Sequence, residues 1–425
     1  MRRSIRVMTA AMALSILFTG CSVHSGHSRR EDEEPAKAKA PFDYSEVSNT
    51  TVSDEDRFIS EYNRYSFELL SQIAGAEGAA NVMVSPTSIM MAFDVVAAGA
   101  NGDTLTQLTD LFAKGTDPME QQAFAAALME RINDAEGVEF SCANAIWNNS
   151  SILGSKISPD YVEYVGDVFG ADAREEEFNG RTADKINAWI SENTNGMIEG
   201  MIDDIPVSTA MVVANAIAFD AKWAVQFEEP DTAMFTNANG ESSWVDMLSE
   251  DTNSYLETDL AEGFIKKYEG GEYAFVAIIP KDETVNANDF LASFTGEDFE
   301  EFLASTKTGD VTIKLPCFEF DYDTDLGSAL TAMGAGDAFD PDLADFSGIS
   351  EESPLYINKA IHSTHIKVTS EGTQAAAATV IYMYEACCEP EVQARRIIAC
   401  DRPFVYAIIE TSTGMPVFIG TVNNL

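Results

Sequence analysis

The sequence predicts one mixed α+β domain in which helices come early and strands come late. Apolar residues between Phe58 and Ile73 recur at helical spacing, and Ser85-Pro86 begins a second, more apolar helix over Ile89 to Ala98. Segments rich in β-branched and aromatic residues are the predicted strands: Val212 to Phe219, Tyr273 to Ile279, Val311 to Phe320, His365 to Val368, Phe404 to Glu410 and Pro416 to Val422. Because there is no internal repeat and no second linker, we expect a single globular domain.

The first twenty residues are predicted to be a secretion signal. Arg2, Arg3 and Arg6 precede an apolar run from Val7 to Phe18 that is too short to span a bilayer. The run leads into Leu17-Phe18-Thr19-Gly20-Cys21, which resembles the bacterial lipoprotein cleavage box, although Phe18 stands where Leu is usual. The resemblance implies that Cys21 is lipidated. An ordinary signal peptide followed by an incidental cysteine is the alternative.

The segment between Cys21 and the domain is polar, charged and without apolar periodicity. Such a composition cannot bury enough apolar surface to fold on its own. The predicted organisation is therefore a signal peptide at 1–20, a lipidated cysteine and disordered acidic tether at 21–54, and a folded domain at 55–425. The localisation that follows is export, with the chain lipid-anchored at the cell surface or secreted into the extracellular space.

The charge balance excludes several classes of partner. The chain has 26 basic and 70 acidic residues, a formal net charge of −44. A surface this negative repels nucleic acid and anionic lipid, so we expect contact with the membrane only through the lipid anchor. It attracts cationic proteins and speeds their encounter.

No pattern of catalytic, metal-binding or cofactor-binding residues stands out. With Cys21 lipidated, five scattered cysteines remain, an odd number without zinc-site spacing, so we expect free thiols. His362 and His365 lie in a predicted strand, where residues three apart point to opposite faces. A shared metal ion is thus disfavoured, and a buried, hydrogen-bonded His362 is the simpler interpretation. We expect no enzyme activity, no metal and no cofactor.

The segment from Glu371 to Thr379 carries the clearest functional signal. Read as a strand, one face consists only of small side chains, namely Thr373, Ala375, Ala377 and Thr379, and the other of Gln374, Ala376 and Ala378. Such a segment can enter between two strands without displacing core, and Gly372 supplies a flexible hinge. A short surface helix or linker has a compatible composition.

These residues resemble the reactive-loop hinge of the serpin family, and other motifs follow in the family's order. They are Asn81 to Ile89 with Gly99-Ala100-Asn101-Gly102, Ile186-Asn187-Ala188-Trp189, Val213 to Phe219 with Lys222-Trp223 and Phe227, Leu330 to Ile349, Arg402-Pro403-Phe404 and Pro416 to Gly420. The resemblance covers about 370 residues. It implies the serpin fold, with three β-sheets, about nine helices and an exposed reactive-centre loop.

The resemblance also implies a mechanism and a set of site residues. A target protease cleaves the loop, forms a covalent acyl-enzyme and is trapped when the loop inserts into the central sheet. Ser85, Ser88, Asn215 and His362 correspond to the polar cluster that holds two strands of that sheet together and parts during insertion. Ser370 departs from the pattern, because inhibitory members usually have Glu there.

Counting from Gly372 places the reactive bond at Ala386-Cys387. Pro390-Glu391-Val392 supports this register, but the stretch to Arg402 is longer than typical. Ala386 suits an elastase- or subtilisin-like protease with a small apolar pocket. The rivals are Tyr384 or Met383 for chymotrypsin-like targets and Arg395 or Arg396 for trypsin-like targets.

The predicted function is therefore a monomeric suicide inhibitor that forms a covalent complex with a serine endopeptidase. The alternatives are an inhibitor of papain-like cysteine proteases, a non-inhibitory serpin and an extracytoplasmic solute-binding lipoprotein. The last of these fits the anchor and charge but none of the domain motifs.

Overall fold

The computed structural model describes residues 40–133, 137–153, 157–198, 202, 204–350, 355–373 and 395–425. Its helices are η1 (Tyr44–Asn49), α1 (Glu55–Glu77), α2 (Pro86–Ala97), α3 (Gly102–Phe112), α4 (Pro118–Asn133), α5 (Ser150–Leu153), α6 (Pro159–Phe169), α7 (Thr182–Asn193), α8 (Ala287–Leu291), α9 (Gly296–Ala304), α10 (Gly327–Ala332) and η2 (Asp337–Phe339). Its strands are β1 (Val82–Val84), β2 (Val138–Asn149), β3 (Asp172–Glu176), β4 (Met211–Lys222), β5 (Asp231–Thr236), β6 (Ser242–Glu257), β7 (Ala261–Lys267), β8 (Tyr273–Pro280), β9 (Thr306–Pro316), β10 (Phe318–Asp325), β11 (Ile357–Val368), β12 (Gly372–Thr373), β13 (Arg396–Ala399), β14 (Phe404–Glu410) and β15 (Pro416–Val422).

The first two long helices begin at the caps that the sequence supplies. The Asp54 carboxylate accepts a hydrogen bond from the Arg57 N–H at 3.1 Å and caps α1. Ser85 caps α2, and Pro86 occupies its first turn, where a missing N–H costs nothing. Every side chain of α2 is buried, which explains why its sequence is apolar on all sides.

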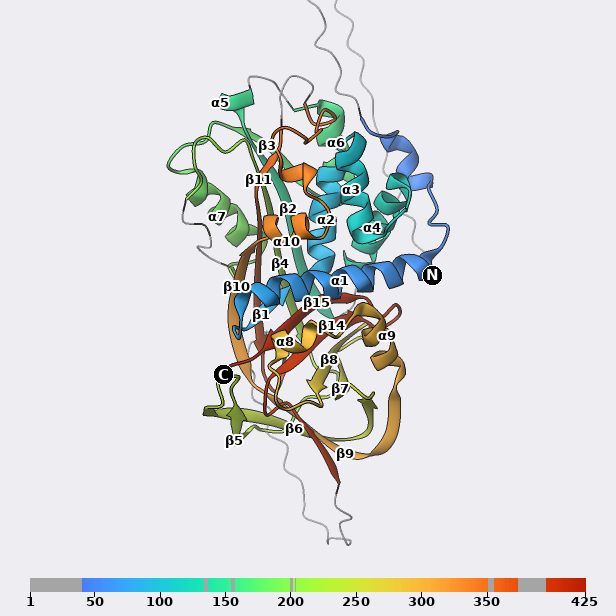
Figure 1. The fold of residues 1–425 in the computed structure, drawn as a ribbon, viewed down its shortest axis with the longest axis vertical. Coiled ribbons are helices and arrows are strands. Elements are labelled where there is room, and N and C mark those ends of the chain that lie inside the picture. The colour runs from blue at the N-terminus through green and yellow to red at the C-terminus, as the bar shows by residue number, and fades with distance from the viewer. Residues whose placement is uncertain are drawn as a thin grey trace, which may run out of the picture. The chain divides into compact units, whose positions relative to one another are not determined.

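The strands form two hydrogen-bonded networks (Figure 1). The six-stranded sheet has the order β10-β11-β12-β4-β2-β3, with an additional pairing between β11 and β4. The nine-stranded network runs β1-β15-β14-β8-β7-β6-β9-β13, with β5 also on β6. Strand β6 pairs with β5 and β9 along most of its length and with β7 only at its end, so it joins two of the three expected sheets. The predicted α+β serpin fold is confirmed.

The six-stranded sheet is covered on both faces, and β4 shows this by its alternation. Met211, Val213 and Ile217 contribute to the main core on the side of α2, whereas Val212 and Ala214 pack with Trp189 of α7 on the other side. Figure 1 shows α7 and α2 on opposite sides of this sheet. The odd-numbered positions of β4, which include Asn215, therefore face α2.

One predicted strand is two strands. The run from Val311 to Phe320 divides at Cys317, whose N–H donates to the carbonyl of Asp246 at 2.8 Å. Strand β9 before it belongs to the nine-stranded network, and β10 after it forms an edge of the six-stranded sheet. Pro316, the last residue of β9, is the local sign of this division, because proline has no N–H to donate to a strand ladder.

Folded structure is present before the predicted domain boundary at residue 55. Residues 44–49 form η1, in which Val47 is buried. The Tyr44 ring stacks on Tyr164 of α6 at 4.1 Å between centroids, and its hydroxyl donates to the Ala98 carbonyl. Two aromatic rings thus supply burial that the polar composition of the segment did not suggest.

Candidate functional site

The site is the line along which β4 and β11 meet. The two strands pair in parallel from Met211 opposite Ile357 to Ile217 opposite Thr364. Beyond that point the strands no longer pair with each other. β12 lies between them instead, with Gly372 opposite Lys222 and Thr373 opposite Ala221 on β4. The sheet is therefore closed over one half of this line and wedged open over the other.

A tight turn leads from β11 into the wedge. The Thr369 N–H and hydroxyl both donate to the Gly372 carbonyl, at 2.9 and 3.1 Å. A Cβ atom at Gly372 would lie 2.2 Å from the Ala221 carbonyl oxygen and 2.8 Å from the Lys222 Cα. Only glycine fits at this position, so the predicted hinge is also a point of close strand approach.

The segment after β4 holds the turn through hydrogen bonds to the turn's backbone carbonyl groups. Trp223 donates from its indole Nε1 to the Thr369 carbonyl and from its backbone N–H to the Glu371 carbonyl, both at 2.9 Å. The Phe227 N–H donates to the Ser370 carbonyl at 3.1 Å. This bond uses the backbone carbonyl of Ser370 and does not depend on its side chain. It can therefore form although Ser370 stands where inhibitory serpins usually have Glu.

Thr373 is buried at the tip of the wedge. Its hydroxyl lies 2.7 Å from the Tyr268 hydroxyl, and the Tyr268 ring stacks on Trp223 at 4.5 Å between centroids. Sequence reasoning placed Trp223 in a family motif but gave Tyr268 no role. A buried tyrosine in a strand is indistinguishable from core until its hydroxyl partner is known.

The four residues predicted to hold the sheet together do lie together, beneath the closed half. His362 and Asn215 are paired across β11 and β4, and His362 Nδ1 lies 2.7 Å from Asn215 Oδ1. The Ser85 N–H donates to His362 Nε2 at 2.9 Å. Asn215 Nδ2 contacts the hydroxyl and carbonyl of Ser88 and the Oδ1 of Asn144, a β2 residue that the sequence did not single out. We call these five residues the polar cluster.

The hydrogen bonds fix the protonation state of His362. Nε2 accepts the Ser85 N–H, so the neutral ring carries its proton on Nδ1 and donates it to Asn215. Complete burial lowers the pKa of His362 from 6.5 to about 3. His365 points elsewhere and lies 2.6 Å from Asp321 on β10. The two histidines therefore do not share a site.

Strand β13 follows the loop in the sequence, and ion pairs at its start join it to β6 and β7. Arg395 pairs with Asp251, and Arg396 pairs with Glu257 at 3.0 Å and Glu262 at 2.6 Å. Hydrogen bonds from Arg396, Lys307 and Lys281 hold the pKa of Glu257 well below its usual range. Cleavage after Arg395 or Arg396 would require these ion pairs to break, which weakens both as trypsin-type reactive residues.

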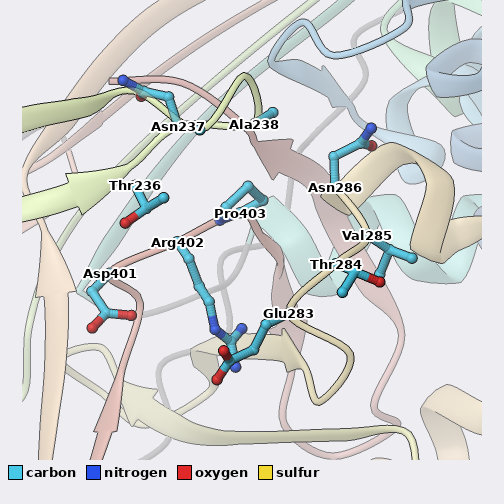
Figure 2. A pocket seen from close by; sticks show the side chains of 11 residues that line it. Thr236, Asn237, Ala238, Glu283, Thr284, Val285, Asn286, Asp401, Arg402 and Pro403 are labelled. Atoms are coloured by element: carbon cyan, nitrogen blue, oxygen red, sulfur yellow. The ribbon is translucent and has the colours of Figure 1, made fainter.

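An open pocket of about 380 Å³ lies where β13 passes into β14 (Figure 2). It is lined by Thr236 and Asn237 from the end of β5, by the segment Glu283 to Asn286, and by Asp401 to Pro403. Figure 2 shows the Arg402 and Glu283 side chains extending on the same side of the pocket. Burial is the largest influence on Asp401 and raises its pKa.

The remaining predicted residues fall outside the described part of the chain. These are Gln374, Ala375, Ala376, Ala377, Ala378, Thr379, Met383, Tyr384, Ala386, Cys387 and Cys21. Within the described ranges Cys317 and Cys400 are free. In the same ranges no group of three or more His, Cys, Asp or Glu residues could hold a metal ion, and no helix has the length and apolar character needed to cross a membrane.

The domain is α+β, and the first residues of a loop lie between two strands of its central sheet. This arrangement is the one expected of the family that the sequence motifs resemble. A family model described as serpin (serine protease inhibitor) matches residues 60–425, and the chain belongs to the serpin family. Serpins are in general inhibitors that bind target proteases, rather than enzymes.

Relatives match over most of the chain. An uncharacterized serpin-like protein of Methanosarcina mazei is 30% identical over 98% of this chain and 97% of its own length. Iripin-8 of Ixodes ricinus is 30% identical over 88% of this chain and 95% of its own. Among solved structures, the thermophilic serpin tengpin in its native state aligns with a TM-score of 0.80 at 31% identity, covering 88% of this chain and 96% of tengpin. Tengpin in the latent state aligns with a TM-score of 0.72 at 30% identity, covering 87% and 98%.

Proposed function

We propose that this serpin inhibits serine proteases by a single-use mechanism in which its cleaved loop enters the sheet between β4 and β11. The observation that carries the proposal is the wedge. Thr373 already pairs with Val368 on β11 and with Ala221 on β4, and Gly372 pairs with Lys222 on β4, so the first residues of the hinge occupy the path that the rest would follow. The direct pairing of β4 with β11 from Met211 to Ile217 supports a starting state in which most of this path is still closed.

The chemistry belongs to the target protease. Its serine oxygen attacks the carbonyl carbon of Ala386, the peptide bond to Cys387 breaks, and the new amine of Cys387 takes a proton from the protease histidine. Ala386 is then an ester of the protease serine. Insertion of the hinge, which has only small residues on one face, carries the protease away before water hydrolyses the ester.

The proposed specificity follows from the reactive bond. Ala386 fits a small, apolar primary pocket, so elastase- and subtilisin-like enzymes are the proposed targets. The ion pairs of Arg395 and Arg396 in and beside β13 argue against the trypsin-like alternative.

The test uses the chain from Ser22 onward mixed with an elastase, a subtilisin, a chymotrypsin and a trypsin. We expect a covalent complex that survives denaturing electrophoresis, and a released peptide beginning at Cys387 by mass spectrometry. A peptide beginning elsewhere would move the reactive bond. Cleavage by all four enzymes without a covalent band would instead mark a substrate and favour the non-inhibitory alternative, and a band with papain alone would favour cysteine proteases.

We further propose that the protein is exported and anchored through a lipid on Cys21. The basic start, the short apolar run and the sequence up to Cys21 support this. Expression with a clickable fatty acid in a bacterial host should label the wild-type chain and leave Cys21→Ser unlabelled. Equal labelling of both, or cleavage at a site other than the one before Cys21, would contradict the anchor.

A further inference from the structure

The hairpin of β5 and β6 has one buried and one exposed face. Phe235 and Met247 are buried on the first face. On the second face Met234 and Trp244 lie directly opposite each other and are 51% and 73% exposed. Thr232, Thr236, Ser242 and Asp246, all exposed, complete that face. The two side chains form a small contiguous apolar surface, and tryptophan is a residue type that is enriched among the residues that dominate protein contacts.

We infer that the Met234–Trp244 face is a second docking contact for the target protease, formed when the protease engages the reactive loop. The inference rests on the proposed inhibitory function and adds to it the part of the body that selects the partner. We call Met234 and Trp244 together the hairpin patch.

The hairpin patch lies within reach of both points where the loop joins the body. Phe227, which bonds to Ser370 at the loop's first end, is seven residues before Met234, at most about 25 Å of chain. Asp251, which pairs with Arg395 at the other end, is seven strand residues after Trp244, about 23 Å. A protease domain of about 240 residues has a radius of gyration near 18 Å. The chain distances from the patch to the two points where the loop joins the body are therefore comparable with the size of such an enzyme.

The segment that carries the patch is acidic in sequence, which favours a cationic partner. No lysine or arginine occurs between Lys222 and Lys266. Five exposed carboxylates flank the patch in sequence and form no ion pair within the described part of the chain: Glu228, Glu229, Asp231, Glu241 and Asp246. The same carboxylates repel an anionic lipid surface, so the tryptophan is not suited to a membrane contact.

The size of the patch argues for a supplementary contact. Two side chains bury far less than the roughly 1,200 Å² that a stable interface needs, so the patch cannot by itself hold a second copy of this chain. A protease already bound to the loop is different, because the second contact is then intramolecular and a weak one suffices. The target protease is therefore the partner that a patch of this size can serve.

The test compares association rates for the chain from Ser22 onward. Variants Trp244→Ser, Met234→Ser and the double variant are measured against each protease of the four that forms a covalent complex. The matched controls are Leu343→Ser and Val207→Ser, which also replace exposed apolar residues. Val207 precedes Met211, at the end of β4 opposite to the wedge.

We expect the double variant to slow covalent association about three- to tenfold, with the same final yield of complex. The controls should match the wild type. Raising the ionic strength from about 0.05 to 0.5 M should slow the wild type, because the flanking carboxylates steer the protease.

Equal rates for the double variant and the wild type with every trapped protease would overturn the inference and leave the proposed function intact. Cleavage of the wild type without any trapping would remove the proposed function and this inference with it. A wild-type dimer in sedimentation that Trp244→Ser converts to a monomer, without a change in association rate, would assign the patch to self-association and also overturn the inference.

Discussion

The two halves of the line between β4 and β11 differ in what occupies it. Over the closed half the strands bond to each other, and the polar cluster joins them to α2 from beneath. Over the open half they are separated by Gly372 and Thr373, and aromatic residues and main-chain bonds hold the turn. Further insertion of the loop is therefore opposed at the closed half. There, each inserted residue must first separate a β4 residue from the β11 residue with which it is paired.

The largest predicted effect is a loss of folding stability when His362 in the closed half is replaced. His362→Ala removes the partner of the Ser85 N–H and the Asn215 amide and leaves a cavity, so we expect a loss of about 3 kcal/mol in the free energy of unfolding. Denaturant unfolding followed by tryptophan fluorescence measures it. The matched control is His365→Ala, on the same strand but outside the polar cluster. Its side chain is 11% exposed and pairs with Asp321, which is itself exposed, so we expect a loss of no more than about 1 kcal/mol. Equal losses for the two variants would remove the special role of the cluster.

In the open half, replacing Thr373 should impair protease inhibition. Thr373→Arg places a charged side chain where a hydroxyl now meets Tyr268 in a buried site, so the wedge cannot form. We expect at least about a fivefold rise in the molar ratio needed for inhibition, since strain of about 1–3 kcal/mol favours hydrolysis of the ester over insertion. Titration of protease activity measures the ratio. Thr373→Ser should behave as the wild type, and an unchanged ratio in Thr373→Arg would show that insertion does not pass through this position.

Acid should weaken the closed half selectively. Because the pKa of His362 is lowered to about 3 while the unfolded value is near 6.5, the unfolded chain binds a proton in this window that the folded chain does not. Stability contributed by neutral His362 is thus present above pH 6.5 and falls by up to about 1.4 kcal/mol per unit as the pH drops toward 3. The measurement compares the pH slopes of the wild type and His362→Gln between pH 6 and 4.5. Parallel slopes would contradict the assignment.

The smallest predicted loss of stability is at Arg396 in β13, directly after the loop. Arg396→Met keeps the stem of the side chain but removes its partly buried ion pairs with Glu257 and Glu262. We expect a loss of about 1 kcal/mol that shrinks at high salt. Chemical denaturation at two salt concentrations measures it. A loss that is insensitive to salt would point to packing on Tyr255, over whose ring Arg396 lies.

The sequence predicted some of these features from local signals and could not predict others. The bounds of β14 and β15 match the predicted strands, because turn residues flank both. The start of α2 matches because Ser85 and Pro86 are a cap and a first turn. By contrast, residues 40–54 were assigned to a tether, since their burial depends on the distant Tyr164 and Ala98.

Only those residues of the candidate site that lie in family motifs could be predicted from the sequence. Ser85 and His362 are 277 residues apart, and nothing local to either residue indicates that they meet. The resemblance supplied Ser85, Ser88, Asn215 and His362 but not Asn144 or Tyr268. Each of those two matters through a single hydrogen bond across strands, which a one-dimensional pattern does not encode.

The central claim, that the loop enters the sheet between β4 and β11, is tested most directly by cutting the loop and measuring heat stability. The chain is nicked between residues 374 and 394 by limited proteolysis, and thermal unfolding of cut and intact protein is compared. If about ten inserted residues each add roughly 1 kcal/mol, the cut form should melt at least about 10 °C higher. A cut form that melts at the same or a lower temperature would contradict insertion and, with it, the inhibitory mechanism.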